Sequence, residues 1–259
     1  MPKPNANISR LLIVVTAILI WQLLADFGLI ETSSLSSPIG AATHIWLLLS
    51  NHGDISNFYA NFYATLLELF FAYAIVAVMG VSIGLAIGMN KFLGLTLEPL
   101  IIAFFSIPTV VLYPIAYLLL GLGIASKVAQ GILVGFFPVI ANSAAGTKQV
   151  PKEFIRLGTS LGFSRIEMIR KILIPSALPS IATGLRLGLS MSLIGITAGE
   201  MIASTVGLGH LISDSFDLFR TNDVFALVFI VVGIATLGNL LLSYVEAKAS
   251  RFRMTDIGK

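Results

Sequence analysis

Long apolar segments separated by short polar ones dominate the chain. A membrane helix needs about 20 mostly apolar residues to cross about 30 Å of hydrocarbon. Alternating ten-residue segments of the kind found in membrane β-barrels do not occur. The pattern therefore predicts an all-α membrane protein with six transmembrane helices, at Leu11–Ile30, Thr65–Met89, Leu95–Leu120, Val128–Ala145, Ile181–Ala203 and Val224–Leu242.

Prolines lie inside two of these segments: Pro108 and Pro114 in the third and Pro138 in the fourth. Neighbouring helices in a membrane bundle can satisfy the carbonyl groups that a proline leaves free, so each segment is still predicted to be one span. The first apolar run continues through Trp21 without a small-x-small cleavage site. It is therefore predicted to be a retained anchor and not a signal peptide.

Lysine and arginine are distributed unevenly between the two sides of the predicted bundle. Thirteen of the sixteen fall on the side that holds both termini. The connection 31–64 contains none, and only Lys127 and Arg220 fall on the opposite side. Positive loops mark the cytoplasmic face, so both termini are predicted to be cytoplasmic.

The composition agrees with a membrane protein, because 56% of the residues are hydrophobic and only 11% are charged. A soluble domain usually carries about a quarter charged residues. The net charge of +3 gives no support for a polyanionic partner such as nucleic acid. The absence of cysteine excludes disulfides, thiolate metal sites and a cysteine nucleophile.

A polar segment of unusual length, 148–175, separates the fourth and fifth spans. Pro151 suits the first position of a helix, and Gly162 suits its left-handed end. Ser164 and Glu167 form the pattern of a capping box for a second helix, which Pro175 is expected to stop. The segment is therefore predicted to form two short amphipathic helices. They either lie on their own bundle or dock another protein.

The residues of this segment resemble the coupling-helix motif of ABC importer permeases, E-A-A-x3-G-x9-I-x-L-P. The matching stretch is Arg156-Leu-Gly158-Thr-Ser-Leu-Gly162, nine residues, then Ile172-Leu-Ile174-Pro175. Arg156 stands where the family has its glutamate, and Gly158 where it has the second alanine. Further segments are similar to the sulfonate/nitrate/taurine branch: Pro151–Glu153, Leu178–Arg186, Ser106–Pro108, Leu120–Lys127, Ala198–Glu200 and Gly207–Gly209.

The resemblance covers roughly residues 62–246 and implies a type I ABC importer permease fold in a bacterial inner membrane. It implies a homodimer, two cytoplasmic ATP-binding subunits that hold ATP and Mg, and a periplasmic substrate-binding protein. This chain would then be a transport subunit and not an enzyme, with no cofactor of its own. Glu153 is predicted to replace the missing glutamate. The implied coupling residues are Glu153, Arg156, Gly158, Gly162, Ile172 and Pro175.

These inferences divide the chain into three parts. Residues 1–61 form the anchor helix and a periplasmic connection, residues 62–246 the permease domain with its coupling segment 150–175, and residues 247–259 a cytoplasmic tail.

Ionisable residues inside spans are costly and are therefore candidates for the translocation pathway. Glu68, Arg186 and Glu200 qualify. Arg186 and Glu200 cannot pair within one helix, because fourteen positions span about 21 Å. Glu68, where relatives often carry a basic residue, lies near the outer end of its span and is expected to contact water. After Glu200, the segment 204–223 with Gly207 and Gly209 forms, in relatives, a short helix that folds back as an outer gate. The alternative is an ordinary external loop.

Several other patterns suggest chemistry but have simpler explanations. Gly80-Val-Ser82-Ile-Gly84 matches the nucleophile elbow of hydrolases as a string, but that motif needs a strand-to-helix turn. Together with Gly88, the glycines are predicted to be a seam for close helix packing. The chain contains no phosphate-binding G-x4-G-K-[ST] motif, and its three histidines are too scattered to predict a metal site.

Three classes of function remain to be compared. A secondary transporter should show two repeated halves with broken helices, and a membrane enzyme should show a catalytic constellation, but neither pattern is present. The ABC permease explains the charge bias and the coupling segment. The resemblance implies a small anion or a sulfonate-, nitrate- or taurine-like solute as substrate. A vitamin precursor is the alternative solute, and a secondary transporter is the alternative class.

Overall fold

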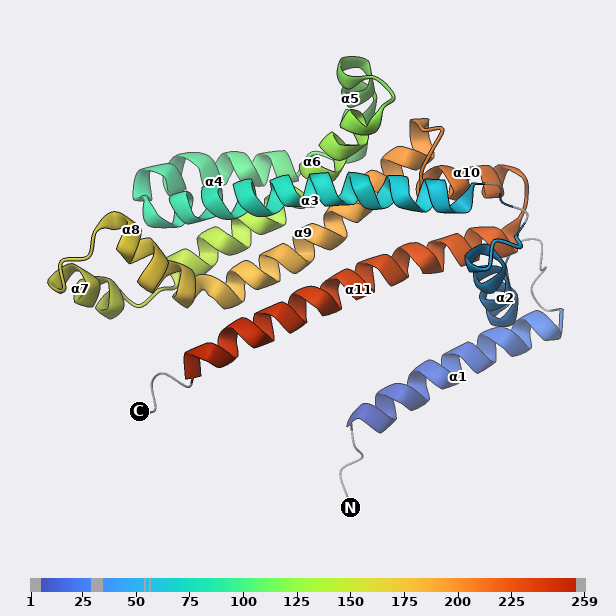
Figure 1. Cartoon of the computed structure of the whole chain (residues 1–259), viewed down its shortest axis with the longest axis horizontal. Helices are drawn as coiled ribbons and strands as arrows, with labels where there is room; N and C mark the ends of the chain where they lie inside the picture. The colour runs from blue at the N-terminus through green and yellow to red at the C-terminus, as the bar shows by residue number, and fades with distance from the viewer. Residues whose placement is uncertain (1–5, 29–34, 54, 56, 255–259) are drawn as a thin grey trace.

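The structure, a computed structural model, describes residues 6–28, 35–53, 55 and 57–254, and all regular structure in this part of the chain is helical (Figure 1). The elements are α1 (Ala6–Asp26), α2 (Pro38–Leu49), α3 (Phe58–Met89), α4 (Lys91–Phe105), η1 (Thr109–Leu112), α5 (Tyr113–Leu120), α6 (Ile124–Lys148), α7 (Lys152–Ser160), α8 (Arg165–Met168), the π-helical turn η2 (Ile169–Leu173), α9 (Ile174–Ala203), α10 (Leu208–Asp217) and α11 (Thr221–Met254).

The centre of the fold is a bundle in which α6 packs between α3 and α9, and α11 runs along α9 (Figure 1). The helix α10 packs on α9, α11 and α3 at one end of this bundle, and α2 packs on α11 at the same end. The coupling segment with α7 and α8 lies at the other end (Figure 1). We call these the α10 end and the α7 end.

Glycines allow α3 and α6 to approach closely. An added Cβ atom at Gly84 would lie 2.7 Å from the carbonyl oxygen of Ile140, and one at Gly88 would lie 2.9 Å from that of Ala144. An added Cβ at Gly80 would lie 2.9 Å from Val139. In membrane bundles small residues permit such backbone contact, which gains dispersion energy where hydrophobic burial gains little.

Four helices in the described part of the chain are long and apolar enough to cross a membrane: 58–89, 124–148, 165–203 and 221–244. The pair α4 and η1–α5 adds a fifth if it counts as one span. The protein is thus a multi-pass membrane protein with four to five candidate spans. The described apolar part of α1, Leu12–Asp26, is shorter than a span, and the end of the predicted first span, 29–30, lies outside the described residues. The first of the six spans therefore stays a prediction.

The predicted third span is not one continuous helix, although the bent pair can still count as one span. α4 ends at Phe105, and the chain bends by 86° before the helical stretch Thr109–Leu120. Pro108 has no N–H group, and its ring disfavours helical geometry at Ile107, so the helix ends before it. Pro114, in contrast, lies in the first turn of α5, where no helical hydrogen bond is lost.

The prediction that Pro175 stops a helix was wrong. The helical rise continues from Arg165 to Ala203, with the π-helical turn η2 inside it. Pro175 falls in the first turn of α9, directly after η2. A π-helical turn changes the hydrogen-bond spacing, and at this position the missing N–H of proline interrupts no regular α-helical ladder.

Candidate functional site

The loop between α7 and α8 is built by one glycine and one capping box, as the sequence predicts. Gly162 has φ +72°, and the N–H groups of Gly162 and Phe163 donate to the carbonyls of Thr159 and Gly158, each at 3.0 Å. These bonds satisfy the last carbonyls of α7. Ser164 caps α8 with Glu167 in a reciprocal capping box. Both predictions are confirmed, and the loop is rigidly specified by local chemistry.

The two short helices pack on each other through Gly158. An added Cβ atom at Gly158 would lie 2.6 Å from Ile172 Cδ1 and 2.9 Å from Met168 Cε. Ile172 therefore fills the space left by the missing side chain and fixes the angle of α7 to η2.

The outer face of this segment is apolar and uncovered. Four apolar side chains of this segment are between 49% and 64% exposed: Phe154, Leu157, Leu161 and Ile166. They are exposed because α7 and the loop after it project beyond the end of α3 (Figure 1). The charged Glu153 and Arg156 on the same helix are also exposed, and neither forms an ion pair with a described residue. The segment thus offers apolar contacts flanked by unpaired charges, which is typical of a protein-docking surface.

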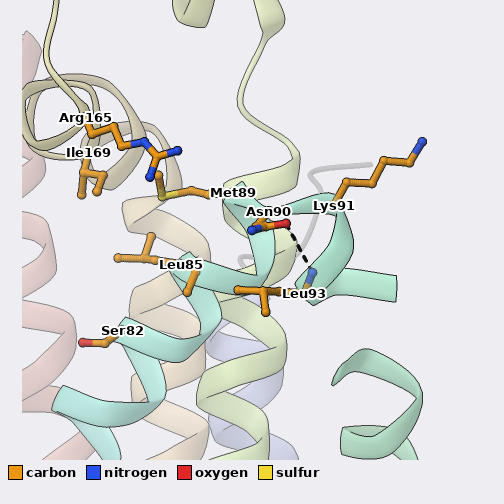
Figure 2. Close-up of a pocket in the computed structure, with 9 residues that line it drawn as sticks. Ser82, Leu85, Met89, Asn90, Lys91, Leu93, Arg165 and Ile169 are labelled. Carbon is orange, nitrogen blue, oxygen red and sulfur yellow. Dashed lines mark hydrogen bonds between the residues drawn. The ribbon is translucent and has the colours of Figure 1, made fainter. Parts of the chain in front are cut away.

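A cavity of about 720 Å³ lies beside this segment, between the end of α3, the start of α4 and α8. Lys91 and Arg165 bring positive charge to its wall. In Figure 2 the guanidinium group of Arg165 points toward Met89, whereas the Lys91 side chain extends away from the other lining residues. The Asn90 side chain is occupied in capping α4, with Oδ1 accepting from the N–H groups of Phe92 and Leu93.

A second cluster of polar residues lies at the α10 end, inside the protein. Glu68 on α3 and Lys127 on α6 form an ion pair of 2.9 Å and are at most 1% exposed. Lys127 also donates to Ser204 Oγ at 2.9 Å. The expectation that Glu68 contacts water was wrong, because the neighbouring helices cover it completely. Lys127 lies in the first turn of α6.

The same cluster holds the start of α10. Its first N–H groups, which have no partner inside the helix, are bound by side chains from α3 and α9. Gly207 N donates to Asn61 Oδ1 at 2.7 Å, Leu208 N to Thr65 Oγ1 at 2.8 Å and Gly209 N to Glu200 Oε2 at 2.8 Å. Glu200 is fully buried, and its carboxylate lies at the positive end of the α10 dipole. These hydrogen bonds therefore join α3, α9 and α10 at one point.

The two glycines of this segment make the close approach possible. Gly207 has φ +113°, and a Cβ atom there would overlap the Glu200 carboxylate. A Cβ atom at Gly209 would overlap the carbonyl of Thr197. The predicted short helix after Glu200 is present as α10, although its role as a gate remains a prediction.

Three residues of this cluster escaped the sequence analysis: Asn61, Thr65 and Lys127. Asn61 and Thr65 look like ordinary polar residues near a helix start. Lys127 could have been found from the sequence, because it directly precedes an apolar span and a buried lysine requires a partner.

Arg186 is separated from this cluster. Its guanidinium binds Glu246 of α11, and it also donates to Thr183 Oγ1 at 3.3 Å. The two side chains of the ion pair are 30% and 24% exposed. The structure thus brings Glu68, Glu200, Gly207 and Gly209 together and leaves Arg186 as a link between α9 and α11.

Comparison with known proteins agrees with this architecture. The family model described as "Binding-protein-dependent transport system inner membrane component" matches residues 78–251. The formylaminopyrimidine transport permease protein ThiX of Halalkalibacterium halodurans is 31% identical, over 74% of this chain and 76% of its own. The taurine transport system permease protein TauC of Escherichia coli (strain K12) is 28% identical, over 93% of this chain and 87% of its own.

The fold is also similar to a solved transporter. A chain of the methionine ABC transporter MetNI, in inward-facing conformations, matches with a TM-score of 0.56. The match covers 84% of this chain and 98% of the other, at 17% sequence identity. This likeness shows a shared fold.

Proposed function

Because this chain belongs to the family of binding-protein-dependent transport system inner membrane components, we propose that it forms the substrate pathway of an ATP-driven importer as one copy of a homodimer. The pathway would lie between the two copies, chiefly along α3 to α9. The setting would be a bacterial inner membrane, with all six predicted spans present and both termini in the cytoplasm. ATP and Mg would be bound by two separate cytoplasmic subunits, and a periplasmic protein would deliver the substrate.

The observation that carries this proposal is the uncovered apolar face of the coupling segment. Phe154, Leu157, Leu161 and Ile166 would lie in cytoplasmic water, where so much exposed apolar surface is unfavourable unless a partner covers it. An ATP-binding subunit is the partner that the family supplies. Gly162 and the capping box hold this face in a fixed shape, so that movement of the subunit is passed to the chain.

The mechanism follows from linkage between two conformations. A partner that binds one arrangement of the permease dimer more tightly than another shifts the equilibrium toward it by that difference in affinity. Closure of the ATP-binding subunits would move α7. Since α7 packs on η2 through Gly158 and Ile172, the movement would reach α9 directly. The continuous helical rise from Arg165 to Ala203 then connects the coupling segment to the α10 end.

For the substrate we propose a small anion or a sulfonate-, nitrate- or taurine-like solute. The similarity to a taurine permease over 93% of this chain supports it. The similarity to a formylaminopyrimidine permease, at 31% identity, supports the alternative of a vitamin precursor. The binding protein would make most of the selection, so the candidates are best separated by screening that protein with taurine, alkanesulfonates, nitrate and formylaminopyrimidine.

Affinity purification of the tagged chain from native membranes tests the proposal. We expect an ATP-binding subunit to co-purify, and we expect Gly162→Leu to abolish its recovery because a residue with a side chain is strained at φ +72°. Gly121→Leu is the matched control, since Gly121 has φ +75° and open space around it but lies outside the coupling segment. Transport by the chain alone without ATP would contradict the proposal and favour a secondary transporter.

A further inference from the structure

The cluster at the α10 end contains two acids and one base in a place closed to water. Glu68 and Glu200 are 0% exposed, and Lys127 is 1% exposed. Thr65, one turn before Glu68 on α3, donates to Glu200 Oε1 at 2.7 Å, so the two acids belong to the same buried cluster. With all three groups ionised, the cluster would carry one uncompensated negative charge. Burying such a charge is far more costly than burying a neutral group.

The hydrogen bonds of the two acids differ. Both oxygens of Glu200 accept hydrogen bonds, from Thr65 and from Gly209 N. Glu68 has Lys127 as its ion partner through Oε1, whereas no described group donates a hydrogen bond to Oε2. A pair of carboxylates contains no donor of its own. One proton held by the pair would supply the missing donor and remove the excess charge together.

We therefore infer that the Glu68–Glu200 pair is a proton-binding site, which holds one proton while α10 is docked. Lys127 is then balanced by one carboxylate, which leaves the buried cluster electrically neutral. Because Glu200 also accepts from Gly209 N at the start of α10, repulsion between two ionised carboxylates after loss of the proton weakens the docking of that helix. The inference goes beyond the proposed transport function and does not require it.

The other titratable groups near the site do not change the net charge of the cluster. Tyr117 of α5 interacts with both acids, but its hydroxyl donates to the carbonyl of Gly199 and stays neutral. His210 of α10 lines a separate outer cavity together with Asn61, Asp214 and Arg220.

Infrared spectroscopy of the purified chain tests the inference directly, because a protonated carboxylic acid has a C=O stretching band that a carboxylate lacks. We expect this band in the wild-type protein at neutral pH and its loss in both Glu68→Gln and Glu200→Gln. In either variant one acid and Lys127 remain in the cluster, and no proton is needed for neutrality. Glu98→Gln is the control, since Glu98 pairs with Lys148 at the α7 end, is 39% exposed and should leave the band unchanged.

The pH dependence of unfolding gives a second test. A native state that holds one extra proton loses stability as the pH rises, up to tenfold in the folding equilibrium per pH unit. Wild type should therefore lose stability as the pH rises above the pKa of an unperturbed glutamate, about 4.3, and Glu68→Gln should lose less. If a variant fails to fold, the infrared spectrum of the wild-type protein still shows whether a protonated carboxyl group is present. Absence of the band at neutral pH, or its persistence in both Gln variants, would overturn the inference.

Discussion

The hydroxyl group of Thr65 donates to Glu200 Oε1 at 2.7 Å and accepts from Leu208 N at 2.8 Å, so one side chain joins α3, α9 and α10. Residues 65 and 200 are far apart in the sequence, and both are fully buried. The contact shows how the α10 end is fastened: two spans supply the side-chain oxygens, and the short helix supplies the backbone donors.

Thr65→Val should destabilise the docking of α10. Valine has the shape of threonine but leaves Leu208 N and Glu200 Oε1 without a partner, which costs about 1–3 kcal/mol for a buried group. Thermal unfolding and hydrogen exchange of the α10 amides would measure the effect. Thr65→Ser keeps the hydroxyl and is the control. Equal exchange rates in wild type and the valine variant would show that the bond contributes nothing.

Gly207→Ala should lower the melting temperature more than Gly121→Ala, although both glycines have positive φ. The variant combines strain at φ +113°, of order 1–3 kcal/mol, with an overlap between its Cβ and the Glu200 carboxylate. Gly121→Ala has the positive φ but open space around it. The difference between their melting temperatures therefore reports the contact with Glu200. Equal losses would mean that Glu200 moves aside without cost.

Gly84→Ala should loosen the packing of α3 on α6. The new methyl group would lie 2.7 Å from the carbonyl of Ile140, and such overpacking typically costs about 1–3 kcal/mol. Gly233→Ala, on α11 with nothing within 4 Å, removes the same flexibility without a clash and should be neutral or stabilising. Unfolding in detergent compares the two. A stable Gly84→Ala protein would contradict the close-packing explanation.

Glu153→Lys should reduce the coupling of ATP hydrolysis to transport, if the ATP-binding partner offers a basic group at this position. Glu153 is the exposed acid on α7, whereas Arg156 has the opposite charge. The measurement is substrate-stimulated ATPase activity of the reconstituted complex. Asp217→Lys makes the same change at the α10 end and should leave recovery of the ATP-binding subunit unaffected. Full coupling in Glu153→Lys would remove Glu153 from this role.

Local patterns in the sequence were sufficient where short-range chemistry decides the structure. Gly162 and the Ser164–Glu167 capping box occur as predicted, because positive φ and reciprocal capping depend on residues within a few positions of each other. Hydropathy found the four long spans for the same reason, since the bilayer imposes one length and one polarity on every crossing. The motifs likewise identified the family without a structure.

Only the tertiary structure decided what happens between segments. The helix through Pro175 depends on the π-helical turn that precedes this proline. The pairing of Glu68 with Lys127 depends on the packing of α3 against α6, which brings residues 59 positions apart to 2.9 Å. A sequence shows that a buried charge needs a partner, but several partners satisfy that need equally well. Packing selects one of them, because it alone fixes which helix faces meet.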